Sequence, residues 1–323
     1  MLKRIFILPF LVILSTYSYA KLKEKRSYKS FIYEIMLKIK QTKKAFLTVE
    51  GARQAQSNIQ VETYGPHTTL NHQFKCGIKR ETITGATTYI INEQKDEVQD
   101  VVLYIHGGAW FKDPLDAHFQ FVDQLANELN AIVIMPIYPK VPHANYQDTF
   151  NMLEVIYNRI QNKYQNGVRI TLIGDSAGGQ IALSFAQLMK LQGINQPDNL
   201  VLISPVLDAS LSNPDIFKYK NKDPMLGVHG LKYFIKQWAS ELPIEDWRIS
   251  PINGNLTGLG HITLIVGTKE LLYPDVRRLS TLLNQYKVPH EFIIGYNLFH
   301  IYPVFDIPER RQVITKLRCI LKQ

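Results

Sequence analysis

The feature that most constrains the fold is a series of short apolar runs that alternate with stretches of helical periodicity. Strands that are apolar on both faces and are joined by helices form a parallel sheet that helices cover on both sides. The sequence therefore predicts an α/β fold with a mostly parallel central sheet, helices on both faces and a helical cap. The apolar runs are VVLYI (101–105), AIVIMPI (131–137), RITLI (169–173), LVLIS (200–204), ITLIV (262–266) and EFIIG (291–295).

Two regions depart from this alternation. Residues 73–91 show a strand–turn–strand pattern that is broken at Gly85. The stretch between Pro205 and Pro251 holds Trp238, Trp247 and five prolines but has no clear strand pattern. We interpret this stretch, at about 205–250, as an insertion that forms part of a lid over a catalytic domain spanning 61–323.

A serine lies between two glycines where the run 169–173 gives way to a predicted helix. Gly174-Asp175-Ser176-Ala177-Gly178 matches the pattern G-x-S-x-G at a strand-to-helix turn. Such a turn strains the backbone of the serine, exposes its hydroxyl and leaves no room for side chains two positions away. The N–H groups at the start of the following helix favour negative charge. The pattern therefore predicts that Ser176 is a nucleophile.

A loop of small residues follows the predicted strand 101–105. It reads His106-Gly107-Gly108-Ala109. A serine nucleophile needs N–H donors aimed at the negative oxygen that develops during acyl transfer. We predict that Gly107, Gly108 and Ala109, together with Ala177, form this oxyanion hole, and that His106 shapes the loop by hydrogen bonding.

The base and the acid of a serine triad are expected to follow the serine in the chain. His300 follows the strand 291–295 and is the candidate base. Glu270 lies four residues after Val266, at the end of the preceding strand, and is the preferred acid. Asp275 lies further along and stays an alternative acid, although it also suits the start of a helix.

The first twenty residues have the layout of a secretory signal peptide. Lys3 and Arg4 precede an apolar stretch from Ile5 to Leu14, and Ser18-Tyr19-Ala20 fits a cleavage site. The apolar stretch is shorter than the ~20 residues that span a membrane. We expect an exported protein, extracellular or attached to the membrane or cell wall, with an uncleaved anchor as the alternative to cleavage.

Residues 21–60 are expected to form a basic amphipathic helical segment of the cap. Residues 21–50 contain nine Lys or Arg and only three Glu, so most of the net positive charge lies there and the catalytic domain is nearly neutral. This distribution argues against a nucleic-acid-binding surface. The apolar side chains expected on one helix face suggest either packing on the domain behind, which we favour, or weak attraction to anionic lipid or wall polymer. These side chains are those of Tyr28, Phe31, Ile32, Ile35, Met36 and Ile39.

Several motifs together resemble the α/β-hydrolase superfamily, and closely the hormone-sensitive-lipase-like carboxylesterases. HGGAW (106–110) resembles the family's HGGG oxyanion motif, and GDSAGG (174–179) resembles its serine elbow. The resemblance covers roughly residues 65–321 and departs from the family at Ala109, which replaces a glycine, and at Glu270, where Asp is commoner. Further similar segments are YPKVPHANYQD, LISPVLDAS, RISPING and VGTKELLYPD.

The resemblance implies a Ser–acid–His carboxylesterase that acts on small acyl esters without a metal or a cofactor. Carried onto this chain, it makes Ser176 the nucleophile, His300 the base and Glu270 the acid. Two alternatives stay open, namely an amidase, formamidase or peptidase on the same fold, and a binding protein that has lost catalysis. The sequence does not define the acyl group, the alcohol or the oligomeric state.

Overall fold

The architecture is known from a computed structural model that describes residues 11–322, apart from 69, 96 and 165–166. Its centre is an eight-stranded sheet with the strand order β1-β2-β4-β3-β5-β6-β7-β8. The strands are β1 (Ile78–Ile83), β2 (Ala86–Ile91), β3 (Val101–Ile105), β4 (Ile132–Pro136), β5 (Ile170–Asp175), β6 (Asn199–Ile203), β7 (His261–Gly267) and β8 (His290–Gly295).

Six neighbouring strands of this sheet run parallel, from β4 through β3, β5, β6 and β7 to β8. Only β1 and β2, the predicted strand–turn–strand pair, join in antiparallel fashion. The central strands β3, β4, β5 and β6 are buried along their whole length, whereas β1 at the sheet edge is largely exposed. The predicted mostly parallel α/β fold is confirmed, because the apolar runs are the strands that helices cover on both faces.

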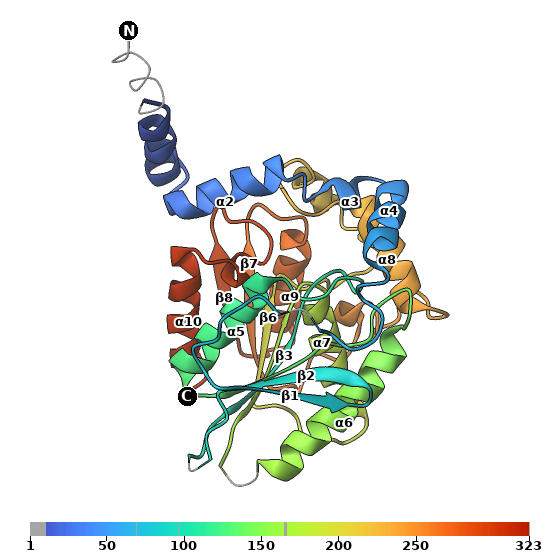
Figure 1. Cartoon of the computed structure of the whole chain (residues 1–323). Helices are drawn as coiled ribbons and strands as arrows, with labels where there is room; N and C mark the ends of the chain where they lie inside the picture. Colours follow the sequence, from blue (N-terminus) through green and yellow to red (C-terminus); the bar gives the residue numbers. More distant parts are fainter. Residues whose placement is uncertain (1–10, 69, 96, 165–166, 323) are drawn as a thin grey trace.

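The helices surround the sheet on two sides. Helices α5 and α10 pack together on one side of it, and α6 and α7 pack together on the other (Figure 1). The larger helices are α2 (Tyr28–Ile39), α4 (Val49–Ile59), α5 (Asp116–Leu129), α6 (Tyr146–Lys163), α7 (Ala177–Leu191), α8 (Val228–Ala239), α9 (Tyr273–Gln285) and α10 (Pro308–Ile320). The short elements are α3 (Lys44–Leu47) and η1 to η4 (Tyr19–Lys23, Pro214–Lys218, Pro251–Asn253 and Tyr302–Val304).

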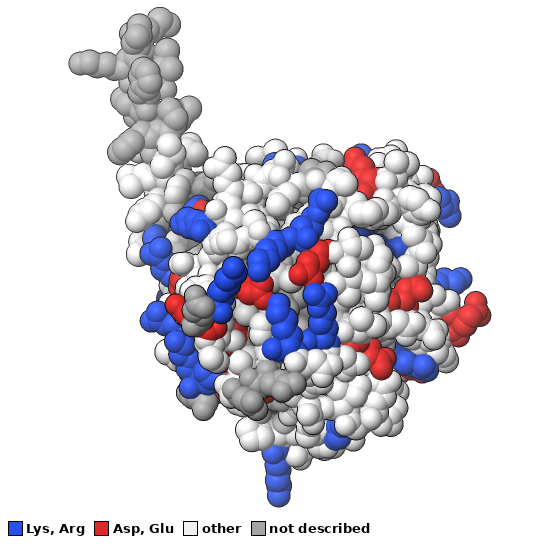
Figure 2. Space-filling view, turned by 60° about the horizontal axis from the view of Figure 1, so that its bottom comes forward, with Lys and Arg blue, Asp and Glu red and all other residues white. Residues whose placement is uncertain are grey.

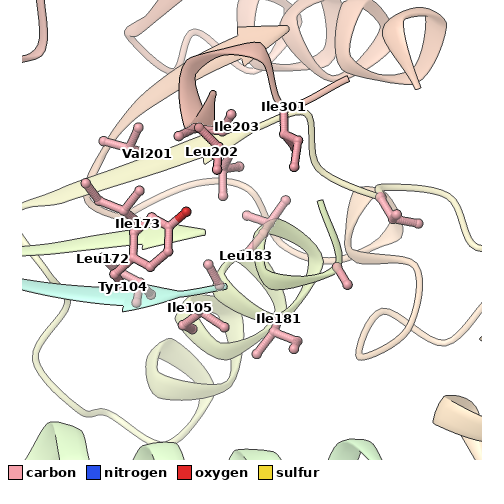
Figure 3. Close-up of a cluster of buried hydrophobic side chains, with 14 of the residues drawn as sticks. Tyr104, Ile105, Leu172, Ile173, Ile181, Leu183, Val201, Leu202, Ile203 and Ile301 are labelled. Atoms are coloured by element: carbon pink, nitrogen blue, oxygen red, sulfur yellow. The ribbon is translucent and has the colours of Figure 1, made fainter. Parts of the chain in front are cut away.

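The core lies where β3, β5 and β6 meet α7. Leu172 and Ile173 of β5, Ile203 of β6 and Ile181 of α7 are fully buried. Figure 3 shows these side chains together, with Ile301 close to the end of β6. This packing fixes the carboxyl ends of the strands, and the chemically active loops of a parallel sheet lie at that edge.

The two stretches that we expect to form a cap, 21–60 and 205–250, pack against each other although they lie far apart in the sequence. Helices α3 and α4 contact α8, which lies in the region 205–250. Phe234 of α8 stacks on Phe111 with a ring separation of 3.8 Å and meets Phe46 of α3 at 5.9 Å. The contact is close because Gly230 of α8 lies directly against the α3 backbone, where an added Cβ would lie 2.4 Å from Phe46 Cα.

Helix α2 packs on the domain through a face that the sequence analysis did not predict. Its buried residues are Ser30, Glu34 and Leu37. On the predicted apolar face, Met36 is 40% exposed and Ile39 is 75% exposed, and the other predicted side chains are half-buried. The expectation that the apolar face covers the domain is therefore wrong. The cause is a buried ion-pair network around Glu34, which the hydrophobic periodicity does not reveal.

Candidate active site

Ser176 lies at the sharp turn between β5 and α7, with φ 54° and ψ −117°. This backbone conformation is strained for a residue with a side chain. A Cβ on Gly174 would lie 2.2 Å from the carbonyl oxygen of Gly178, and a Cβ on Gly178 would lie 2.0 Å from that of Ile105. Both glycines are therefore required for the close approach of β5, α7 and β3 at this turn.

His300 connects Ser176 to Glu270. Its Nε2 lies 2.9 Å from Ser176 Oγ, and its Nδ1 lies 2.5 Å from Glu270 Oε2. All three side chains are buried or nearly so, with Ser176 5% and His300 2% exposed. The three residues come from the ends of β5, β7 and β8, and the structure brings them together as a hydrogen-bonded row.

The second carboxylate oxygen of Glu270 is also held. Oε1 accepts hydrogen bonds from the backbone N–H of Gly267 at 2.7 Å and from the Ser204 hydroxyl at 2.8 Å. The Ser204 oxygen in turn accepts from the N–H of Ile301, the residue after His300, at 3.1 Å. Ser204 thus ties the acid loop to the histidine loop. No sequence motif pointed to a role for Ser204, although it ends an apolar run on the same sheet edge.

Asp275, the alternative acid, lies in the first turn of α9 and is buried. Its Oδ1 accepts a hydrogen bond from Asn213 Nδ2 at 2.7 Å, whereas the acid hydrogen-bonded to His300 is Glu270. Burial raises the pKa of Asp275 to about 6, against the opposing effects of Asn213 and Arg278. The geometry therefore favours Glu270 as the partner of His300.

The environment of His300 favours the protonated imidazole. Burial alone would lower its pKa, but the Glu270 carboxylate at Nδ1 outweighs that effect, and the pKa is raised above its ordinary value of 6.5. The buried carboxylate of Asp223 contributes in the same direction. Asp223 also accepts a hydrogen bond from the N–H of Leu271, next to Glu270, at 2.7 Å. A proton taken from Ser176 would therefore be stabilised on His300.

The loop 106–109 does not supply all the donors that were predicted. The N–H of Gly107 donates to Asp175 Oδ1 at 3.0 Å, so Gly107 is already committed and its assignment to the oxyanion hole is wrong. In the part of the chain that the structure describes, the N–H groups of Gly108, Ala109 and Ala177 donate no hydrogen bond. Gly108 and Ala109 both have positive φ angles, 131° and 51°. These three N–H groups are the candidate oxyanion donors.

Asp175 supports the loop 106–109 by hydrogen bonding. Besides Gly107, it accepts from the Tyr104 hydroxyl at 2.5 Å and lies 3.2 Å from His118 Nε2. Burial opposes its ionisation, but His118 and the hydrogen bonds prevail and hold the pKa of Asp175 below its usual value. His106 stacks on Tyr138 at 4.4 Å, and its Nδ1 lies 2.6 Å from the Gly107 carbonyl oxygen. The loop-shaping role expected for His106 agrees with this position.

A buried ion-pair network joins the N-terminal part of the chain to the acid loop. We call Glu24, Arg26, Glu34 and Lys269 the N-terminal clamp. Arg26 lies 2.6 Å from both glutamates, and Lys269 Nζ lies 2.5 Å from Glu24 and 3.0 Å from Glu34. The Arg26 side chain is 1% exposed and that of Glu34 is 5% exposed. Because Lys269 precedes Glu270 in the chain, the clamp fixes the backbone that carries the acid.

The arrangement can activate a hydroxyl and stabilise the charge that forms on its target. His300 is placed to accept the Ser176 proton, and Glu270 orients and stabilises the imidazolium. Three N–H groups beside the serine suit an oxyanion. Of the residues that position these groups, Asp175 belongs to the G-x-S-x-G motif, whereas no motif assigns a role to Ser204 or to the N-terminal clamp.

Comparisons with known proteins agree with this architecture. A family model described as an alpha/beta hydrolase fold matches residues 102–304. An esterase from Acinetobacter venetianus is 27% identical over 220 residues, which cover 67% of this chain and 73% of that protein. A solved Staphylococcus aureus protein assigned as an esterase is 27% identical with a TM-score of 0.83, over 88% of this chain and 96% of that one.

A further solved structure, an esterase from the bacterial hormone-sensitive lipase family, has a TM-score of 0.77 at 19% identity. The match covers 91% of this chain and 97% of that one. At this level of identity the likeness shows a shared fold. This similarity of fold extends well beyond residues 102–304, the part of the chain that the family model matches.

Proposed function

This chain belongs to the α/β-hydrolase fold family, and from that premise we propose that it is an exported serine carboxylesterase for small, short- to medium-chain acyl esters. The observation that carries the proposal is His300, which is hydrogen-bonded to Ser176 on one side and to Glu270 on the other. The esterases to which the chain is similar support the reaction class. Export rests on the residue pattern of 1–20, of which 1–10 lie outside the described residues.

The reaction proceeds through an acyl-enzyme. His300 Nε2 takes the Ser176 proton while Oγ attacks the ester carbonyl carbon, and the N–H groups of Gly108, Ala109 and Ala177 stabilise the resulting oxyanion. The imidazolium then protonates the leaving alcohol as the ester C–O bond breaks. A water molecule, deprotonated by His300, attacks the acyl-enzyme and releases the carboxylic acid, and the proton returns to Ser176 Oγ.

Large buried side chains that are hydrogen-bonded to the helix of the nucleophile support a small acyl group. Trp110 follows the oxyanion loop, Trp238 lies on cap helix α8, and both donate to Gln180 Oε1, at 3.0 and 3.1 Å. Gln180 is four residues after Ser176 on α7, and both indoles are fully buried. Two indoles fixed to the helix of the nucleophile occupy volume that a long acyl chain would need.

The test is hydrolysis of p-nitrophenyl esters from acetate to long-chain acyl groups. We expect the highest kcat/KM for short chains, and a loss of roughly 10³-fold or more in Ser176→Ala, because no other hydroxyl is hydrogen-bonded to His300 among the described residues. Full activity in Ser176→Ala would refute the proposal. A matched aryl amide distinguishes esterase from amidase, since an amide that is cleaved as fast as the ester would reassign the activity.

A further inference from the structure

We propose that residues 11–44 form a lipid-docking segment that stays attached to the exported protein and holds it on a membrane with anionic headgroups. The proposal concerns where the protein acts and does not depend on its hydrolase activity. It rests on three observations, namely the packing of residues 16–20 onto α2, the exposed apolar side chains on either side of that contact, and the unpaired lysines among them.

The chain on both sides of the predicted cleavage site is built into the fold. Ala20 is fully buried, and its carbonyl accepts a hydrogen bond from the N–H of Arg26 at 3.1 Å. Upstream of it, the ring of Tyr17 lies 5.4 Å from that of Tyr28, and the two hydroxyls of Thr16 and Tyr28 lie 3.1 Å apart. Cleavage after Ala20 would remove these contacts. We therefore infer that the upstream residues belong to the mature protein.

The segment is also held rigidly to the catalytic domain. Arg26 and Glu34 belong to the N-terminal clamp, which pairs them with Lys269 beside the acid loop. At the start of α2, Ser27 donates its N–H and its hydroxyl to the two carboxylate oxygens of Glu309 on α10, at 2.7 and 2.8 Å. A membrane that bound the segment would therefore bind the whole domain in one orientation.

Several apolar side chains of the segment are at least half exposed. Leu11, Val12, Ile13 and Leu14 are each 50–56% exposed. They lie on a helical stretch, 11–18, that projects from the body next to α2 (Figure 1). Further along, Ile39 is 75% exposed at the end of α2. Exposed large apolar side chains that gather on one element mark an interaction surface, whereas scattered ones do not.

Basic side chains flank the apolar ones. The lysines are exposed and, among the residues that the structure describes, have no hydrogen-bonded or ion-paired acidic partner. Figure 2 shows blue side chains on the body of the protein, near the base of the projecting N-terminal segment. Lysines at the base of an apolar helix suit anionic headgroups at the level where the helix enters the lipid. Three of the lysines, Lys21, Lys23 and Lys25, follow the helical stretch 11–18 directly, and the other two, Lys40 and Lys44, lie beyond the far end of α2.

The occupant that fits this surface is one leaflet of a bilayer. The described helical stretch 11–18 rises about 12 Å, less than half of the ~30 Å hydrocarbon core. None of the helices in the described part of the chain is long and apolar enough to cross a membrane. An apolar tip with a basic collar matches lipid better than a soluble polyanion, which would need only the lysines.

The experiment is sedimentation of the full-length chain with phosphatidylglycerol–phosphatidylcholine vesicles. The variant replaces Leu11, Val12, Ile13 and Leu14 with Asn, and the control is Leu191→Asn, which removes a 76% exposed leucine from the end of α7. We expect the wild type and the control to bind alike. The fourfold variant should bind at least tenfold more weakly while p-nitrophenyl acetate hydrolysis is retained.

Four results would overturn the proposal. The first is a wild-type protein that stays in the supernatant, and the second is a fourfold variant that binds as tightly as wild type. The third is an intact mass of the exported protein that begins at Lys21, because the docking residues would then be gone. If the protein binds a soluble polyanion as tightly as vesicles and the fourfold variant does the same, plain charge attraction replaces lipid docking.

Discussion

Glu270 supplies the charge that sets the pH range of His300. Its carboxylate is the main reason why the pKa of His300 is raised despite burial. Activity requires neutral His300, so kcat/KM should fall as the pH drops through a pKa above 6.5. Glu270→Gln removes the charge, so we expect this acidic limb to move to lower pH while the maximal rate falls roughly 10³- to 10⁴-fold. Full pH–rate profiles of both proteins would measure the two effects, and an unmoved limb would argue against this pairing.

Asp275 should behave as a buried acid outside the triad. Its pKa rises from 3.8 when exposed to about 6 in the fold, so the folded protein loses stability as the pH rises between these values and bears the full cost above them. We expect Asp275→Asn to be more stable than wild type at pH 8, by up to about 3 kcal/mol, with no gain near pH 3.5. Urea unfolding at both pH values tests the stability, and kcat should stay within about twofold of wild type. A large loss of kcat would return Asp275 to the triad.

At the scale of elements, the close contact of α3 and α8 sets the position of the cap. A Cβ at Gly230 would meet both Phe46 Cα and the Ala45 carbonyl at under 3 Å, at 2.4 and 2.7 Å. Gly230→Ala should therefore push α3 away from α8 and destabilise the fold by about 1–3 kcal/mol.

The matched control for Gly230→Ala is Gly77→Ala, where an added Cβ meets no atom within 4 Å. Thermal unfolding and the chain-length profile of ester hydrolysis measure the result, because a displaced cap should also change acyl selectivity. Equal melting temperatures for the two variants would show that the cap contact is not tight.

The N-terminal clamp is a set of buried charges whose contribution to the stability of the fold depends on pH. Burial opposes ionisation of Glu34, but Lys38, Arg26 and Lys269 overcome it, and the pKa of Glu34 is lowered below 4.5. Its contribution to stability is thus present in full above pH 4.5 and is lost as the pH falls through the folded-state pKa. Glu34→Gln should lower the free energy of unfolding by about 3–5 kcal/mol at pH 7, because the buried cations Arg26 and Lys269 each lose an ion-pair partner.

A suitable comparison for Glu34→Gln is Glu50→Gln, since the pair of Glu50 with Arg53 is exposed, at 75% and 63%. We expect a change of under about 1 kcal/mol there. Unfolding free energies of both variants at pH 7 and pH 4 test the assignment. A Glu34→Gln protein as stable as wild type at pH 7 would contradict it.

The structure of α2 and of the loop 106–109 also shows which features the sequence patterns do not predict. Hydrophobic periodicity correctly located α2, but it assigned the wrong buried face. Glu34 is buried because it pairs with Lys269, which lies more than two hundred residues away in the chain. The hydrogen bond that the Gly107 N–H makes was equally unpredictable from the sequence. Its N–H is committed to Asp175, a contact across two strands that no local pattern specifies. Long-range polar contacts of this kind decide the details that motifs leave open.

At the scale of the whole molecule, the fold and the row of three site residues were predictable for one physical reason. The carboxyl ends of parallel strands meet at one edge, so Ser176, Glu270 and His300 had to converge once the strands were located. The supporting residues were not predictable, because Ser204 and Asp223 act through hydrogen bonds to backbone or carboxylate groups that depend on loop geometry.

Active-site labelling with a fluorophosphonate probe tests whether Ser176 is an activated nucleophile. We expect one adduct per chain, mapped to the peptide that contains Ser176, with labelling slowed strongly in His300→Asn and absent in Ser176→Ala. An unlabelled wild-type protein that is folded, or equal labelling in Ser176→Ala, would contradict it.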